Sequence, residues 1–170
     1  GIRATGGAIG PEKSHYYLLD FIWKDGNFSY ASPTDAPASV SILDKDGNRQ
    51  ILERVEPNRA QKTLGVFLAP DGNDDDQFNA LLEKSQAWAD QVRAGHLPRR
   101  LALQSLKQSL WMSLKWPLAA TCLSEEQCKK IMRPALKAGL PRIGFVPSFP
   151  RALVHAPKQY IGLDVPCIFA

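Results

Sequence analysis

The sequence predicts an α+β protein in which antiparallel β-hairpins come first and a helical bundle with a proline-rich tail follows. Up to residue 76, short apolar segments that alternate with polar residues are separated by Asp-Gly and Gly-Asn turn signals. From residue 77 onward, apolar residues recur at helical spacing. Between the two patterns lies Lys62–Leu68 (KTLGVFL), an apolar strand with a glycine at its centre.

The 170 residues are 44% hydrophobic and 22% charged, which is typical of a globular protein. We expect three regions, namely a β region over 1–76, a helical region over 77–145 and an irregular, truncated extension over 146–170. Because the chain lacks an initiator Met and ends in the apolar run Val165–Ala170, we expect a piece of a longer protein. No run approaches the roughly 18 apolar residues of a spanning helix, so we expect no membrane partner.

The first hairpin is predicted at Asp25-Gly26, a strong two-residue turn signal. Phe28 and Tyr30 begin its return strand. The segment Tyr16–Trp23 before the turn alternates as a half-buried strand does, and its apolar face would be Tyr17, Leu19, Phe21 and Trp23.

A second hairpin is predicted to pair Val40–Leu43 with Gln50–Val55 across Asp46-Gly47-Asn48. The acidic turn also invites comparison with a calcium loop. However, the twelfth position counted from Asp44 is Val55, where such a loop places a bidentate Glu. Turn chemistry therefore explains these residues better than calcium binding.

The first helix is predicted after a run of aspartates, which we expect to cap free backbone N–H groups, and it ends at Gly95. Pro98 is expected to open a second helix with a leucine stripe, which Pro117 ends. Ser124 and Gln127 form a capping box for a third helix. Pro134 should kink or split that helix, and Trp88, Trp111 and Trp116 are expected in the core.

Three cysteines, Cys122, Cys128 and Cys167, lie among apolar neighbours without CxxC spacing. We interpret them as buried free thiols in a reducing, intracellular compartment, with cytoplasm and nucleus not distinguished. The three histidines are scattered along the chain, so the sequence predicts no metal site.

Charge divides along the chain more sharply than the net value of +4 suggests. Residues 1–76 hold 8 Lys and Arg against 12 Asp and Glu, whereas residues 77–170 hold 13 against 5. Such asymmetry indicates either polyanion binding or a solvated basic face. A basic cluster is predicted at the corner between the first two helices, where the same two interpretations apply; its residues are Arg93, His96, Arg99, Arg100 and Lys107.

Two segments together resemble the reverse transcriptases of retrotransposons, especially the non-LTR class. Gly7–Ser14 (GAIGPEKS) resembles the G-x-x-I-N-x-x-K-S/T segment that follows the catalytic aspartates of the palm. Lys62–Leu68 resembles the K-Y-L-G-V/I-x-L hairpin that grips the primer, after which the family has a helical thumb. Phe149–Val154 and Tyr160–Leu163 further resemble reverse-transcriptase-like retroelement proteins.

The resemblance implies a palm-like β region, a primer-grip strand and a thumb-like helical region that hold an RNA template and a DNA primer. It implies that Lys13 stands where a lysine assists pyrophosphate departure, and that Leu64 and Gly65 sit against the primer terminus. The basic residues Arg93, Arg99, Arg100 and Lys107 would then contact the duplex backbone. Gly10 and Thr63 depart from the family pattern, which usually has Asn and an aromatic residue there.

The Tyr/Phe-x-Asp-Asp turn that holds Mg²⁺ in such polymerases does not occur in this chain. We therefore expect Mg²⁺ and the catalytic aspartates to belong to upstream palm and fingers of the same polypeptide, with no cofactor bound here. The resemblance makes the parent protein an RNA-directed DNA polymerase, and we expect this chain by itself not to polymerise nucleotides. The alternatives are a stand-alone basic nucleic-acid-binding module and a non-catalytic structural or interaction domain.

Overall fold

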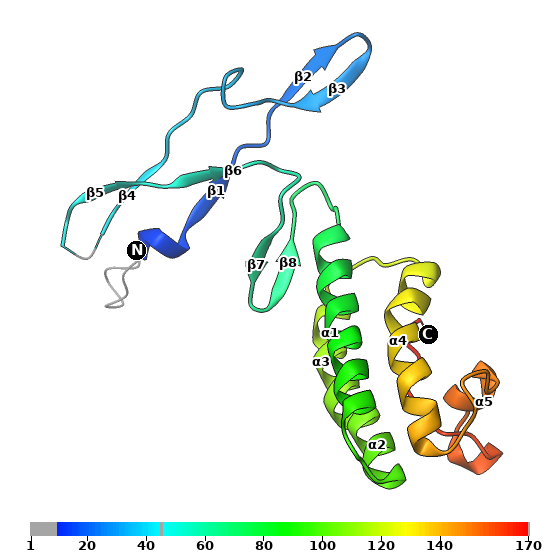
Figure 1. The fold of residues 1–170 in the computed structure, drawn as a ribbon. Helices are drawn as coiled ribbons and strands as arrows, with labels where there is room; N and C mark the ends of the chain where they lie inside the picture. The colour runs from blue at the N-terminus through cyan, green and yellow to red at the C-terminus, as the bar shows by residue number, and fades with distance from the viewer. Residues whose placement is uncertain (1–9, 45, 170) are drawn as a thin grey trace. The chain divides into compact units, whose positions relative to one another are not determined.

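The computed structural model describes residues 10–44 and 46–169 and divides into two compact units. The strand unit comprises the described residues up to Gln61 together with Ala69–Asn73. The helical unit comprises Lys62–Leu68 and residues 74–169. Figure 1 shows the mixed α+β architecture that the sequence predicts. The predicted three-region division is not tested by these units and stays a prediction.

The strand unit contains one short 3₁₀ helix and six short strands. These are η2 (Pro11–Lys13), β1 (His15–Tyr17), β2 (Phe21–Lys24), β3 (Asn27–Tyr30), β4 (Ser41–Leu43), β5 (Arg49–Ile51) and β6 (Glu53–Val55). β2 and β3 pair antiparallel, as do β4 and β5, whereas β1 and β6 pair in parallel.

The Asp25-Gly26 hairpin is confirmed, with Phe21 opposite Tyr30 and Lys24 opposite Asn27. The continuous strand over Tyr16–Trp23 is wrong, because β1 and β2 pair with different partners and the chain leaves strand geometry between them. Its apolar face is also not half-buried as expected, since the exposed fractions of Leu19 and Trp23 are 54% and 72%.

The second hairpin is confirmed for β4 and β5 but not for residues 53–55, because β6 pairs with β1 instead. In its turn, the Asp44 carboxylate accepts hydrogen bonds from the backbone N–H groups of Asp46 and Asn48, at 2.9 and 2.8 Å. These bonds, with the one from Asn48 contributing most, lower the pKa of the Asp44 carboxyl from its ordinary value. The aspartate therefore shapes the turn.

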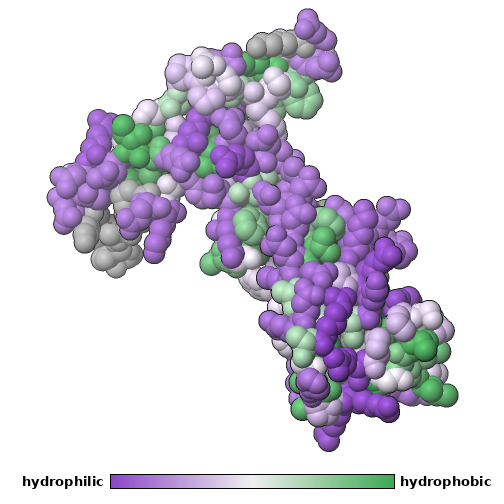
Figure 2. All heavy atoms as spheres, in the orientation of Figure 1, coloured by the Kyte–Doolittle hydropathy of each residue, from purple (hydrophilic) through white to green (hydrophobic). Residues whose placement is uncertain are grey.

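Hydrogen bonds rather than apolar packing hold the strand unit together. Arg54 donates to the carbonyls of Ala36 and Ala31, at 2.6 and 2.8 Å, and so fastens the loop after β3. Among the described residues of this unit, only Ala31, Val55 and Pro57 are buried. Figure 2 shows apolar atoms at the surface over β2 and β3.

The helical unit begins with a hairpin and continues with helices that enclose the main core. Its elements are β7 (Gln61–Thr63), β8 (Val66–Leu68), α1 (Asp75–Ala94), α2 (Arg99–Ser105), the π-helical segment η3 (Leu106–Leu110), α3 (Trp111–Leu118), α4 (Glu125–Ile143), α5 (Arg151–His155) and the 3₁₀ helix η4 (Lys158–Tyr160). Figure 1 shows α1 and α4 running in the same direction and α2 and α3, which lie between them in the sequence, running the opposite way.

The first predicted helix is confirmed as α1, which ends at Gly95. The expected capping role of the aspartates is wrong for Asp74, which stands at the N-cap without a side-chain cap bond. Its carboxylate instead accepts the backbone N–H of Cys122 at 2.7 Å. The residue thus ties the start of α1 to the loop before α4.

Helical conformation starts after Pro98 as expected and runs through α2, η3 and α3 to Leu118. The prediction that Pro117 ends this helix is wrong by one residue, since Pro117 lies buried inside α3. Local sequence gave no sign of the π-helical segment. It adds one residue to a turn, and its first and last residues, Leu106 and Leu110, are buried together with Leu114 of α3.

The capping box of α4 is confirmed, because Ser124 Oγ accepts the Gln127 N–H and Gln127 Oε1 accepts the Ser124 N–H. The split at Pro134 is wrong, since α4 continues through Pro134 and Pro141. A proline inside a helix costs about 3 kcal/mol. The buried face of α4 outweighs this cost, and it consists of Cys128, Ile131, Met132, Ala135, Leu136, Ala138, Gly139 and Leu140.

Trp88 joins three helices of the core. Its ring lies against Gly139, where an added Cβ would stand 3.2 Å from the ring. Its indole N–H donates to Ser105 Oγ at 3.0 Å. The core prediction is thus confirmed for Trp88 and wrong for Trp116, whose exposed fraction is 65%.

The cysteine prediction is correct in one case out of three: Cys128 is buried, but Cys122 and Cys167 are exposed. All three are free thiols. None of the helices in the described part of the chain has the length and apolar character needed to cross a membrane.

The C-terminal segment packs onto the helices. Val154 and Val165 are buried in the core and joined by a backbone hydrogen bond of 3.0 Å. Gly162 passes so close to the Ala156 carbonyl that an added Cβ would stand 1.9 Å from its oxygen. Only glycine fits this backbone approach.

We predict that Ser124→Ala lowers the free energy of unfolding of the helical unit by about 1 kcal/mol, because the first turn of α4 loses its cap. Urea unfolding followed by Trp fluorescence measures the change. Ser109→Ala is the matched control, since Ser109 is exposed within a helix and should change stability by less than about 0.5 kcal/mol. Equal effects of the two substitutions would contradict the capping role.

Candidate nucleic-acid interface

The KTLGVFL segment forms the two-stranded hairpin β7–β8, with Leu64 and Gly65 at its turn. Both turn residues have positive φ, 51° and 87° respectively. Positive φ at both central positions is typical of a type I′ turn, whose twist matches that of a hairpin. Gly65 is therefore needed for backbone conformation, and no atom lies within 4 Å of where its Cβ would be.

Leu64 is unusual at this position. A leucine in the left-handed region is strained, and its exposed fraction is 86%, so no packing of the side chain compensates for the strain. Strained residues of this kind concentrate at binding sites. The tip therefore presents an apolar side chain and an exposed glycine outward.

The hairpin is fastened to the helices at three points. The Phe67 N–H donates to Gln77 Oε1 at 2.8 Å, and Gln77 is a buried polar side chain in the first turns of α1. The Leu64 carbonyl accepts the Trp116 indole N–H at 3.3 Å. Val66 is buried, with 4% of its surface exposed. The turn is thus held on a rigid element.

Three arginines from different helices meet at one end of the helical unit. Arg93 stands in the last turn of α1 and forms a 2.7 Å ion pair with Asp90. The Arg142 guanidinium, in the last turn of α4, donates to the Arg93 carbonyl at 2.7 Å. The Arg99 guanidinium lies against Gly144. With the exposed Arg100, these residues form what we call the arginine corner.

Lys107 does not belong with the arginine corner. Its ammonium forms a 3.2 Å ion pair with Asp164, and only 20% of its side chain is exposed. The lysine thus fastens the C-terminal segment to the helices.

Lys13 lies in the strand unit, exposed at the end of η2. Its N–H and the Ser14 hydroxyl both bond to the Gly10 carbonyl, at 3.1 and 2.9 Å. Residues 7–9 of the segment that resembles the palm motif lie outside the described residues. The turn before Lys13 is therefore seen, and the role of the lysine stays a prediction.

The hairpin tip and the arginine corner are associated with opposite ends of α1. The hairpin bonds to Gln77 near its start, and Arg93 stands near its end. A helix of 20 residues is about 30 Å long. The two parts of the predicted site therefore do not form one pocket.

The sequence analysis did not assign Arg142, Gln77 or Trp116 to the site, and it expected Trp116 in the core. Arg142 lies 49 positions beyond Arg93, so only the packing of α1 against α4 brings the two together. The one available signal was the stretch from Gln127 to Leu163, which contains seven basic residues and no acidic one.

In the part of the chain that the structure describes, no three His, Cys, Asp or Glu side chains group to hold a metal ion. Comparisons with protein-family models, curated proteins and solved structures give no match.

We predict that Gly65→Ala destabilises the hairpin by about 1 kcal/mol, because alanine at positive φ is strained although space is open. The neighbouring Leu64→Asn is the matched control and should stabilise it by up to about 1 kcal/mol, since asparagine adopts this conformation readily. Amide hydrogen exchange at Phe67 measures both. Slower exchange in Gly65→Ala would contradict the assigned turn.

Proposed function

We propose that this chain is part of a retrotransposon-type reverse transcriptase, an RNA-directed DNA polymerase, in which it holds the template–primer duplex. The observation that carries the proposal is the KTLGVFL hairpin. The hairpin, with its strained and exposed turn, is bonded to the start of α1. The arginine corner lies at the other end of α1. Nucleotidyl transfer itself would need Mg²⁺ and aspartates supplied by upstream parts of the polypeptide.

The dimensions of α1 support this proposal. Its length of about 30 Å is comparable to that of a duplex of roughly ten base pairs. A duplex laid along the helical unit would meet the hairpin at its primer end and the arginine corner nearly one turn away. Such contacts go to phosphates and do not depend on sequence.

Charge supports the same assignment. The helical unit holds 14 Lys and Arg against 8 Asp and Glu. Arg99 and Arg100 have no acidic partner among the described residues, so they are available to phosphate. A basic binding module without a polymerase parent would share this charge, and a structural domain would not require it.

We predict that the full chain binds RNA–DNA duplex, and that its affinity falls linearly with salt on a double-logarithmic plot. Fluorescence anisotropy measures this. Arg100→Gln should reduce the slope by about 1, because one phosphate contact is lost. Lys130→Gln, which removes an exposed charge from α4, is the matched control and should leave the slope unchanged. Undetectable binding at low salt would refute the proposed function.

Duplex length gives a sharper test of the geometry. A duplex of about 6 base pairs is at most ~20 Å long and cannot span both contacts, whereas one of about 12 base pairs can, even at the shorter rise of an A-form hybrid. Arg100→Gln should therefore weaken binding of the longer duplex and leave the shorter one nearly unaffected. Equal losses for both lengths would contradict placement along α1.

The polymerase parent is tested by the coding sequence upstream of Gly1. We expect a Tyr/Phe-x-Asp-Asp turn within about 10 to 30 residues, because Mg²⁺-dependent polymerisation needs those carboxylates. If the upstream reading frame is open but lacks the Tyr/Phe-x-Asp-Asp turn, and the chain still binds duplex in a salt-dependent way, the stand-alone binding module is favoured.

A further inference from the structure

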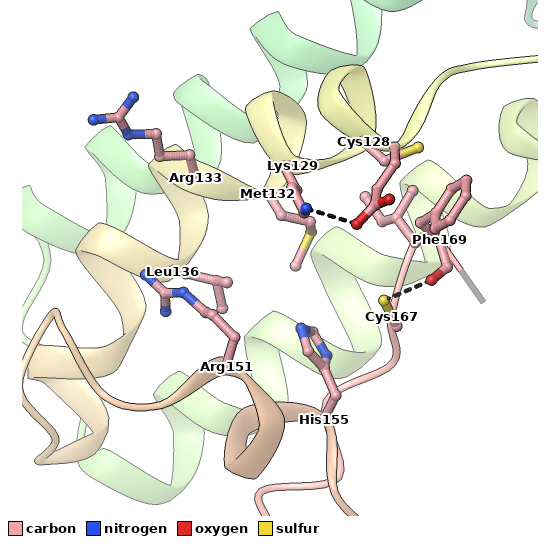
Figure 3. Close-up of a pocket in the computed structure, with 11 residues that line it drawn as sticks. Cys128, Lys129, Met132, Arg133, Leu136, Arg151, His155, Cys167 and Phe169 are labelled. Atoms are coloured by element: carbon pink, nitrogen blue, oxygen red, sulfur yellow. Dashed lines mark hydrogen bonds and ion pairs between the residues drawn. The ribbon is translucent and has the colours of Figure 1, made fainter.

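The helical unit contains a cavity of about 410 Å³ apart from both the hairpin and the arginine corner. Figure 3 shows that α4 forms one wall, α5 a second, and the C-terminal segment a third. The volume falls within the range of small-ligand pockets, about 300–1,000 Å³. The cavity lies entirely within one unit.

Apolar side chains make up much of the cavity wall. They come from α4 and from the last described residues, and they are Cys128, Met132, Leu136, Ile168 and Phe169. Phe169 remains 53% exposed, so its ring can still gain contacts. A flat or apolar group would be accommodated here at little desolvation cost.

Three cationic side chains also line the cavity, and two of them lack an acidic partner among the described residues. Lys129 is paired with Glu125 at 2.6 Å. Arg133 and Arg151, by contrast, form no ion pair among residues 10–44 and 46–169. Arg151 donates to the Pro147 carbonyl at 3.2 Å, which orients its guanidinium without neutralising it. The cavity therefore suits an anion with an apolar, planar body.

We propose that this cavity receives one unpaired nucleotide of a bound nucleic-acid strand, with its base against Met132 and Phe169 and its phosphate beside Arg133 and Arg151. The proposal rests on the proposed function and adds to it a site for single-stranded nucleic acid. A base inside a duplex is stacked on both sides and paired along its edge, whereas an unpaired base can enter a cavity with its ring free. Stacking on aromatic or apolar side chains tolerates any base, so the proposal requires no particular base.

The three cysteines provide a footprint without any substitution. Cys167 lines the cavity and is exposed, whereas Cys122 is exposed but does not line it. Cys128 lines it and is buried; burial, together with the nearby Cys167, raises the pKa of its thiol. Iodoacetamide should therefore modify Cys167 and Cys122 first, which mass spectrometry resolves.

The experiment uses the full chain with RNA–DNA duplexes that are blunt or carry five unpaired nucleotides at the 5′ or 3′ end of the template. At saturation, at least one tailed duplex should slow alkylation of Cys167 about fivefold or more and leave Cys122 unchanged. It should also bind about fivefold more tightly than the blunt duplex, corresponding to one stacked base. An abasic tail, which keeps its phosphates, should give neither effect.

Arg133→Gln and Arg151→Gln should each reduce the gain from the tail and leave blunt-duplex affinity unchanged. Lys137→Gln, exposed on α4 and outside the cavity, is the matched control and should leave the gain intact. The nucleotide assignment would be overturned if the abasic tail protected Cys167 equally well, or if no tail protected it. Decanoate, an anion with an apolar chain and no base, serves as a further probe. If decanoate protects Cys167 and the tailed duplexes do not, the assignment is also overturned. Failure of blunt-duplex binding would refute the proposed function separately.

Discussion

The arrangement of the helical unit depends on the contact between Trp88 and Gly139. The absence of a side chain at Gly139 lets α4 approach the indole ring, and the ring in turn donates to Ser105. One residue thus sets the spacing of α1, α2 and α4. This spacing places Arg142 against the end of α1 and leaves an outer face of α4 for the cavity.

The hairpin obtains its position from a buried polar side chain. Gln77 is 1% exposed, and its amide oxygen accepts the Phe67 N–H. A buried amide without a partner is costly, so the hydrogen bond favours the hairpin and α1 folding together. This explains why the KTLGVFL segment belongs to the helical unit although it consists of strands. A strained tip such as Leu64 persists only where its surroundings hold it.

The strand unit is built differently, with a few short two-stranded pairs and almost no core. Isolated two-stranded pairs are marginally stable in water, and here the Phe28 ring contacts those of Phe21 and Trp23 while all three remain more than half exposed. The Arg54 bonds to two loop carbonyls provide order that apolar burial does not. Alternation in Tyr16–Trp23 therefore indicated strands correctly but not their burial.

Local chemistry in the sequence determined the α+β class, the Asp25-Gly26 turn, the Ser124 capping box and the end of α1 at Gly95, because these depend on residues only a few positions apart. It also identified the KTLGVFL segment and most of the arginine corner. Tertiary structure alone decided the partner of β6, the continuity of α4 through Pro134, the ion pair of Lys107 and the exposure of Trp116. Each depends on contacts between residues distant in sequence, whose packing energy exceeds local preference.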